Sequence, residues 1–185
     1  MAEYYFLSQL PSLDGIGENI PLPITPERFL ELCERFLGKK AMQEVERLTL
    51  LPPRDGEKSS SPLVDRWNEG ERNLRLALAK VRAEKRRKPF ELENVSFSAE
   101  VMKAVRTAVE IENPMEAEKF LNAFRLDFLD SLRPMDAFSI ESVYFYGLKL
   151  KLLLRIRQFD AIKGADAYKN IYNSIMGGDN MEALQ

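Results

Sequence analysis

The apolar residues of this chain recur at three- and four-residue spacing along almost its whole length, which is the period of amphipathic α-helices. The clearest case is residues 26–37, where Thr25 is placed as the N-cap, Pro26 takes the first helical position and Gly38 ends the helix. The apolar face of this segment consists of Phe29, Leu32, Cys33, Phe36 and Leu37. No run of residues alternates apolar and polar positions for long enough to require a sheet.

The same pattern predicts further helices over 40–50, 62–87, 98–109, 114–132, 139–163 and 166–176. Ser98 and Asn113 are placed to cap two of them, and Ser139 to cap the long one near the C-terminus. The helix over 114–132 is expected to bury an apolar stripe of Ala117, Phe120, Leu121, Phe124, Phe128 and Leu132. Residues 50–62 concentrate Pro, Gly and Ser, which predicts a long exposed loop.

The stretch FSIESVYFYGLKLKLLLRIRQFDAIKG, residues 138–164, has two apolar faces on a helical wheel. These faces consist of Phe145, Leu148, Leu152, Ile156 and Phe159, and of Val143, Leu150 and Leu154. Lys149, Lys151, Arg155 and Arg157 are expected along the edges between them. A membrane span would cost about 2.5–3.5 kcal/mol for each cation at the bilayer centre. We therefore predict a central helix that neighbouring helices cover on both flanks.

Together these elements predict an all-α fold, an irregular bundle of about seven helices with a long central C-terminal helix. The 185 residues fit a single helical domain, 1–185, or two closely packed lobes, 1–90 and 91–185. With 45% hydrophobic and 30% charged residues, the composition is that of a folded globular protein. The start, MAEYYFLSQLPSL, lacks the features of a signal peptide, and a single cysteine gives no disulfide framework, so we expect a cytoplasmic protein.

The chain contains no histidine, which changes the expected chemistry. Ser-His-Asp and Cys-His nucleophile systems are excluded, and the commonest transition-metal ligand is missing. Cys33 lies on an apolar helix face and is interpreted as a small buried hydrophobic residue. The many carboxylates beside Lys and Arg at helical spacing are typical of solvated ion pairs. We therefore expect neither catalysis, nor a cofactor, nor a metal site.

Two segments are candidates for binding a partner. The first is KVRAEKRRK, residues 80–88, whose cations are Lys80, Arg82, Lys85, Arg86, Arg87 and Lys88. They are expected to point all around a helix end without interleaved exposed aromatic residues, so a solvated end or a contact for an acidic protein is favoured over nucleic acid. The second is the N-terminal segment with Tyr4 and Tyr5, which either completes the core, the favoured interpretation, or docks on a partner.

Two stretches resemble a known family of V-type ATPase components, named C in prokaryotes and d in eukaryotes. YYFLSQLPSL followed by TPERFLELCERFL looks like the start of that family. The stretch 138–164 is similar to its C-terminal helix, with matching Ile140, Glu141, Val143, Tyr146 and Arg155. The whole chain resembles an uncharacterised bacterial family of similar length that is associated with V-type ATPase operons. Members of the C/d family are nearly twice as long and have acidic residues where this chain has apolar and basic ones at 150–153.

The resemblance implies a non-catalytic helical adaptor without a cofactor. Its partners would be V-type ATPase subunits, the central stalk and the membrane ring, and it would serve ion transport from the membrane periphery without entering the bilayer. Such a shortened C/d-like chain would be a stalk component or an assembly component. The alternative is a stand-alone helical regulator that binds nucleic acid or acidic lipid through residues 80–88.

Overall fold

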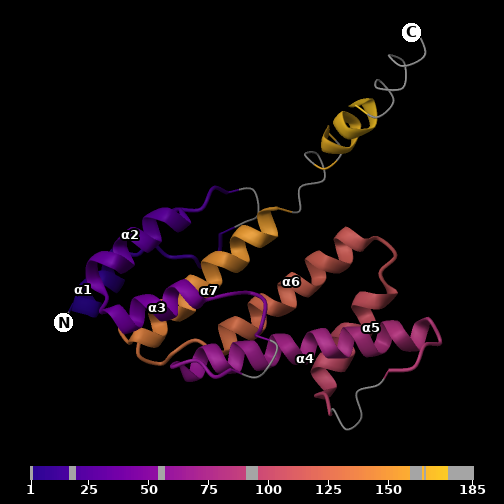
Figure 1. The fold of residues 1–185 in the computed structure, drawn as a ribbon, viewed down its shortest axis with the longest axis horizontal. Helices are drawn as coiled ribbons and strands as arrows, with labels where there is room; N and C mark the ends of the chain where they lie inside the picture. The colour runs from indigo at the N-terminus through magenta and orange to yellow at the C-terminus, as the bar shows by residue number, and fades with distance from the viewer. Residues whose placement is uncertain are drawn as a thin grey trace, which may run out of the picture.

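The computed structural model describes residues 2–16, 20–53, 57–90, 96–158, 164 and 166–174, and these ranges contain helices and no strand. The helices are α1 (Ala2–Gln9), α2 (Pro26–Phe36), α3 (Lys39–Arg47), α4 (Pro62–Lys85), α5 (Ala99–Glu110), α6 (Pro114–Ser131) and α7 (Ile140–Arg157) (Figure 1). A further helical segment covers residues 166–174. The predicted all-α fold is therefore confirmed. The end of the predicted helix over 166–176 lies outside the described residues.

Side-chain caps begin several helices where the local sequence places them. Thr25, Ser98 and Asn113 each accept a hydrogen bond from a backbone N–H in the first turn of α2, α5 and α6, over 3.2, 3.2 and 2.9 Å. Ser61 caps α4 in the same way. Ser139 is the residue before α7, as predicted, but its hydroxyl donates to the carbonyl oxygen of residue 136 and accepts no bond from a backbone N–H of the helix. These starts depend only on neighbouring residues, which is why they are readable from sequence.

The apolar interior consists of two clusters. The larger one joins α1, α2, α3 and α7 to the first half of α4 and the end of α6, with Phe6, Trp67 and Leu129 at most 1% exposed. The smaller one joins the second half of α4 to α5 and α6 through Leu74, Ala77, Leu78, Val105, Ala108 and Leu121. Both clusters combine residues from either side of position 90. The expected lobes 1–90 and 91–185 do not coincide with these clusters and stay a prediction.

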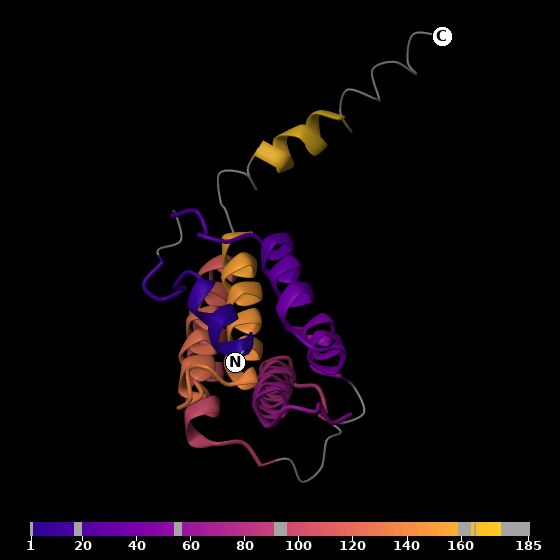
Figure 2. The same ribbon diagram turned by 90° about the vertical axis from the view of Figure 1, so that its left-hand side faces the viewer.

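Helix α7 lies at the centre of the larger cluster and packs against α1, α2, α3, α4 and α6. Figure 2 shows α7 with α2 and α3 on one side and α6 on the other. Leu148 and Leu152 on one face, and Val143 and Leu150 on the other, are at most 2% exposed. The predicted burial of both flanks is confirmed over Ile140–Arg157, and residues 159–163 lie outside the described ranges.

A glycine allows the closest of these approaches to α7. A Cβ atom at Gly147 would lie 2.8 Å from a methyl group of Leu48, the residue that follows α3, and 3.3 Å from the Phe29 ring of α2. Real side chains do not tolerate the shorter distance, so one of these neighbours would have to move. The missing side chain therefore lets the N-terminal helices pack directly on the α7 backbone.

Two expectations about burial need correction. Lys149 was expected along an edge between the apolar faces of α7 but is 6% exposed. Of the six apolar residues in the expected α6 stripe, Leu121 is buried and the other five are partly buried, whereas Asn122 and Arg125 are 1% and 6% exposed. The reason is that α6 packs against α4, α5 and α7 at once, so its polar side also faces protein.

The buried polar side of α6 is held by an ion-pair network. Arg125 donates to both carboxylate oxygens of Glu71 on α4, over 2.9 and 3.2 Å, and to Asn122, over 2.9 Å. It also donates to Glu118 over 3.2 Å, and Glu118 accepts a second bond of 2.7 Å from Arg155 on α7. Because buried charges need charged or hydrogen-bonding partners, this network fixes how α4, α6 and α7 meet.

The segment before α4 is fastened to two other helices. Glu44 of α3 accepts hydrogen bonds from the hydroxyls of Ser59 and Ser60. Ser61 donates to Glu141 at the start of α7 over 2.6 Å and is 1% exposed. Residues 57–61, the end of the loop expected over 50–62, are thus tied to α3 and α7, while residues 54–56 lie outside the described ranges.

The two buried cations are expected to respond differently to removal of their charge. Arg125→Met leaves Glu71, 2% exposed, with Arg75 as its ion-pair partner, and should lower the free energy of unfolding by about 3 kcal/mol. Lys149→Met should lower it by about 1 kcal/mol or less. The partners of Lys149 are Asp14 and Asp130, which are about half exposed and remain hydrated. Urea unfolding of both variants measures this difference, and equal losses would contradict it.

Candidate functional site

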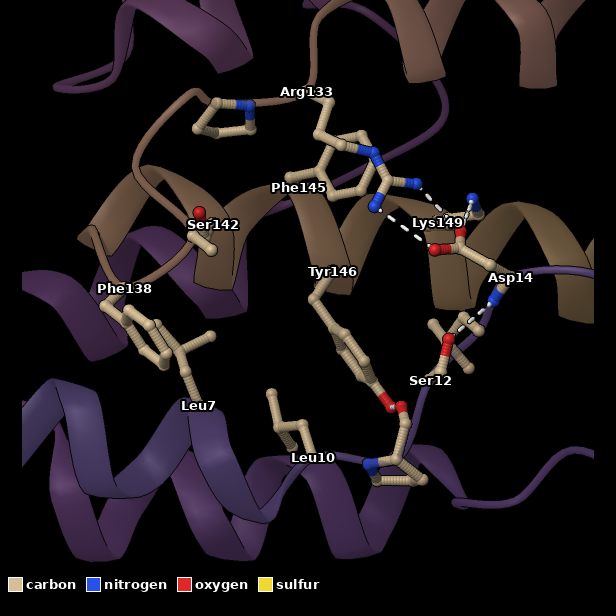
Figure 3. A pocket seen from close by; sticks show the side chains of 14 residues that line it. Leu7, Leu10, Ser12, Asp14, Arg133, Phe138, Ser142, Phe145, Tyr146 and Lys149 are labelled. Atoms are coloured by element: carbon tan, nitrogen blue, oxygen red, sulfur yellow. Dashed lines mark hydrogen bonds and ion pairs between the residues drawn. The ribbon is translucent and has the colours of Figure 1, made fainter.

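A cavity of about 260 Å³ lies between α1, the segment that follows it, and the connection from α6 to α7 (Figure 3). Its apolar walls include Leu7, Leu10, Phe138, Phe145 and Tyr146. Its charged wall consists of Asp14, Arg133 and Lys149. The cavity therefore combines an apolar interior with a fixed group of charges on one side.

The charged wall is a compact cluster of two cations and two carboxylates. Lys149 donates to Asp14 over 2.6 Å and to Asp130 over 2.8 Å. Arg133 donates to both oxygens of Asp14, over 2.8 and 3.2 Å, and to Asp130 over 3.2 Å. Its guanidinium carbon also lies 4.9 Å from the centre of the Phe145 ring. Figure 3 shows both cations directed at Asp14. The four charges compensate one another.

This cluster acts as a clamp for the segment after α1. Hydrogen bonds from Arg133, and then from Lys149, lower the pKa of Asp14 from 3.8 to about 2, so its carboxylate is ionised at neutral pH. The Tyr146 hydroxyl donates to the carbonyl oxygen of Pro11 over 2.9 Å. Burial raises the pKa of Tyr146, which keeps its phenol protonated. These groups hold the backbone and one another, and they fix one side of the cavity.

Large apolar side chains continue from this cavity onto the outer surface. Tyr4 and Tyr5 of α1 are 59% and 60% exposed, and Phe138 is 41% exposed. The rings of Tyr4 and Phe138 lie 4.2 Å apart between centres. Met135, fully exposed, belongs to the same connection as Phe138. We call Tyr4, Tyr5, Met135 and Phe138 the aromatic surface. Tyr4 and Phe138 thus form an exposed aromatic pair, and exposed apolar side chains that lie together are typical of contact sites.

One face of α1 packs into the core, and its other face is exposed. Phe6 is completely buried and stacks on Phe36 of α2, with ring centres 5.8 Å apart. Tyr5 meets the same ring from outside, 5.7 Å between centres. The favoured interpretation, that this segment completes the core, is therefore right for Phe6. A role for Tyr4 and Tyr5 in binding a partner stays a prediction.

The six cations of residues 80–88 do not form one surface. Lys80 lies 5.9 Å from the centre of the Phe97 ring, and Lys85 donates to the carbonyl oxygen of Val109 over 3.0 Å. Helix α4 ends at Lys85, before the predicted end, and Arg87 has a positive φ of 53°. Arg82, Lys85 and Arg86 line a second cleft, between α4, α5 and α6. This end of α4 lies at the opposite end of the fold from α1 (Figure 1).

Sequence reasoning missed the charged clamp of the first cavity. Lys149 carried the one available signal, because a cation between two buried apolar faces requires carboxylate partners. Its partners are 135 and 19 residues away along the chain. No local pattern relates residues at such separations, so Asp14 and Asp130 could not have been selected from the other surface carboxylates.

The thiol and the acidic side chains offer little other chemistry. Cys33 is fully buried, and burial raises the pKa of its thiol to about 12, as expected for a small core residue. Within the described ranges no three His, Cys, Asp or Glu side chains gather in a way that could hold a metal ion. None of the helices there has both the length and the apolar character that crossing a membrane requires.

The clamp makes a prediction about acid stability. Because the pKa of Asp14 is lowered on folding, its contribution to stability is complete above about pH 4 and is lost as the pH falls toward about 2. Asp14→Asn removes this contribution. Between pH 4 and pH 2 the free energy of unfolding of the wild type should therefore fall by about 1 kcal/mol more than that of the variant. This value is reduced because solvent screens an exposed carboxylate. Urea midpoints across this range measure the difference, and parallel curves below pH 4 would contradict it.

Comparison with known proteins places the chain in a family. The family described as "Protein of unknown function (DUF2764)" matches residues 76–179, from the middle of α4 to beyond the helical segment 166–174. Comparisons with curated proteins and with solved structures gave no match. The matched range contains the basic cleft, the α6–α7 connection and Lys149, and it covers more than half of the chain. The protein therefore belongs to the DUF2764 family, a family of unknown function.

Proposed function

We propose that this protein is a non-catalytic helical adaptor that binds another protein through the aromatic surface. The observation that carries the proposal is the exposure of Tyr4, Tyr5, Met135 and Phe138 beside a preformed cavity. Tyrosine, phenylalanine and methionine are enriched in protein interfaces, where they bury large apolar areas. Small ions would gain little from such a surface.

The cavity beside the aromatic surface strengthens the proposal. Its volume of about 260 Å³ accommodates an apolar side chain of a partner, and Phe138 lines both the cavity and the surface. The ion pairs of Asp14 with Arg133 and Lys149 fix one wall before any partner arrives. A preformed site binds more tightly because less conformational freedom is lost on association.

The resemblance to the C/d family supports assigning the partner to a V-type ATPase. In this proposal the chain is a shortened central-stalk or assembly component at the cytoplasmic side of the membrane ring, and it assists ion transport mechanically. Two features suit that role: α7 is covered on both flanks, and the Arg125 network joins α4, α6 and α7. Closely packed helices with buried ion pairs resist relative displacement, so they can transmit force between partners.

The alternative function, a regulator that binds nucleic acid or acidic lipid through residues 80–88, has less support. Lys80 and Lys85 are already engaged by Phe97 and by the Val109 carbonyl. Arg87 and Lys88 follow the end of α4 and do not line the cleft. A phosphate-binding surface requires several cations arranged along one face, and this segment divides its cations among different environments.

The proposal is tested by capture of partners from native cells. Tagged protein isolated in gentle detergent is expected to bring V-type ATPase stalk subunits with it. Tyr4→Ser/Tyr5→Ser should lower this capture about tenfold or more, because removal of exposed aromatic anchors commonly costs at least about 1–2 kcal/mol. The matched control is Tyr168→Ser/Tyr172→Ser, which removes two exposed tyrosines from the helical segment 166–174 and should leave capture unchanged.

Three readouts separate the parts of this proposal. Absence of every V-type ATPase subunit from repeated captures with the wild type would overturn the assigned partner. Equal capture by the Tyr4→Ser/Tyr5→Ser variant and the wild type would overturn the aromatic surface as the contact. Circular dichroism and thermal unfolding of the purified variants confirm that they are folded, which is expected because Phe6 still anchors α1.

A further inference from the structure

The second cleft, between the ends of α4, α5 and α6, has a volume of about 400 Å³. Arg82, Lys85 and Arg86 line it from α4. Ala108 and Leu121 contribute an apolar floor and are 4% and 2% exposed. The cleft therefore presents cations above an apolar base, a combination that the aromatic surface at the other end of the fold does not have.

The charges in this cleft leave an excess of positive charge. Its two acids are Glu112 and Glu118, and Glu118 is already bonded to Arg125 and Arg155, over 3.2 and 2.7 Å. Arg82 and Arg86 are exposed, and within the described part of the chain no carboxylate forms an ion pair with either. With respect to the described residues, two guanidinium groups are thus available to a ligand.

We propose that this cleft binds an acidic peptide segment of a protein partner. Carboxylates of the segment would pair with Arg82 and Arg86, because the planar guanidinium group matches a carboxylate with two parallel hydrogen bonds. An apolar side chain of the same segment would cover the floor at Ala108, Ala117 and Leu121. Charge and apolar contact then act together, as in the centre and rim of an ordinary interface.

The apolar floor distinguishes a peptide from other anions. A phosphate group would engage the arginines and leave the floor bare. Single-stranded nucleic acid binds by stacking bases on aromatic side chains, and the described lining of this cleft contains no aromatic residue. A membrane surface is contacted by protruding apolar side chains, whereas here the apolar residues are at the base of a hollow. A peptide that alternates acidic and apolar residues satisfies both parts of the site.

This site goes beyond the proposed function, because it lies at the opposite end of the fold from α1 (Figure 1). An adaptor with two separate contact surfaces can join two partners, or two parts of one partner, at a defined distance. Binding of both parts would also raise the effective concentration of the second contact once the first has formed.

The test uses the purified full chain and a short fluorescent peptide in which Glu and Leu alternate. Fluorescence anisotropy is expected to show binding that weakens with added salt and disappears when Gln replaces each Glu. Arg82→Ala/Arg86→Ala should weaken binding about tenfold or more, because two charge-assisted contacts are lost. The matched control, Arg87→Ala/Lys88→Ala, removes the same charge from residues outside the cleft and should change the affinity less than about twofold.

Ala117→Phe provides a second test that leaves the charge unchanged. The larger side chain fills the cleft, so binding should be lost while thermal unfolding shows a folded protein. Equal weakening by the two double variants, or no binding of the peptide by the wild type, would overturn the site. Tighter binding to phosphatidylserine vesicles or to a single-stranded oligonucleotide than to the peptide would overturn its assigned ligand. None of these measurements involves an ATPase, so their failure is separate from failure of the proposed function.

Discussion

The burial of α7 on both flanks is the constraint on which the rest of the structure depends. Val143, Leu148, Leu150 and Leu152 are removed from water from two directions, and each contributes about 1.5–3 kcal/mol relative to exposure. This packing leaves Lys149 only 6% exposed. The carboxylates of Asp14 and Asp130 must therefore reach it. Their ion pairs fasten the segment after α1 to α6 and α7 and form one wall of the cavity.

A second set of buried charges organises the other half of the molecule. The Glu71–Arg125 pair holds α4 against α6, and Glu118 extends the network to Arg155 on α7. Because Glu118 also borders the basic cleft, this network neutralises a carboxylate that would otherwise oppose an acidic ligand there. One set of interactions thus fixes the helix packing and the charge of a surface hollow. Both proposed contact surfaces therefore adjoin residues that ion pairs hold in place.

The family match covers the basic cleft completely and the aromatic surface only in part. The basic cleft lies wholly within residues 76–179, and so do Met135 and Phe138 of the aromatic surface. Tyr4 and Tyr5 belong to α1 and lie outside the match. Because the Tyr4 ring contacts the Phe138 ring, the aromatic surface joins the matched region to a segment that precedes it. Within the proposed adaptor role, the cleft would be a property of the matched region and the aromatic surface a property of the whole chain.

The sequence by itself determined the helices that follow α1, the side-chain caps of α2, α5 and α6, and the two apolar faces of α7. Thr25, Ser98 and Asn113 act on backbone groups only two or three residues away, and helical periodicity relates residues within a few turns. Only the tertiary structure decided that Lys149 and Arg125 are buried, that α5 and α6 form a cleft with Arg82 and Arg86, and that Tyr4 meets Phe138. The physical reason is that these contacts join residues distant along the chain, and their energies depend on which helices lie beside one another.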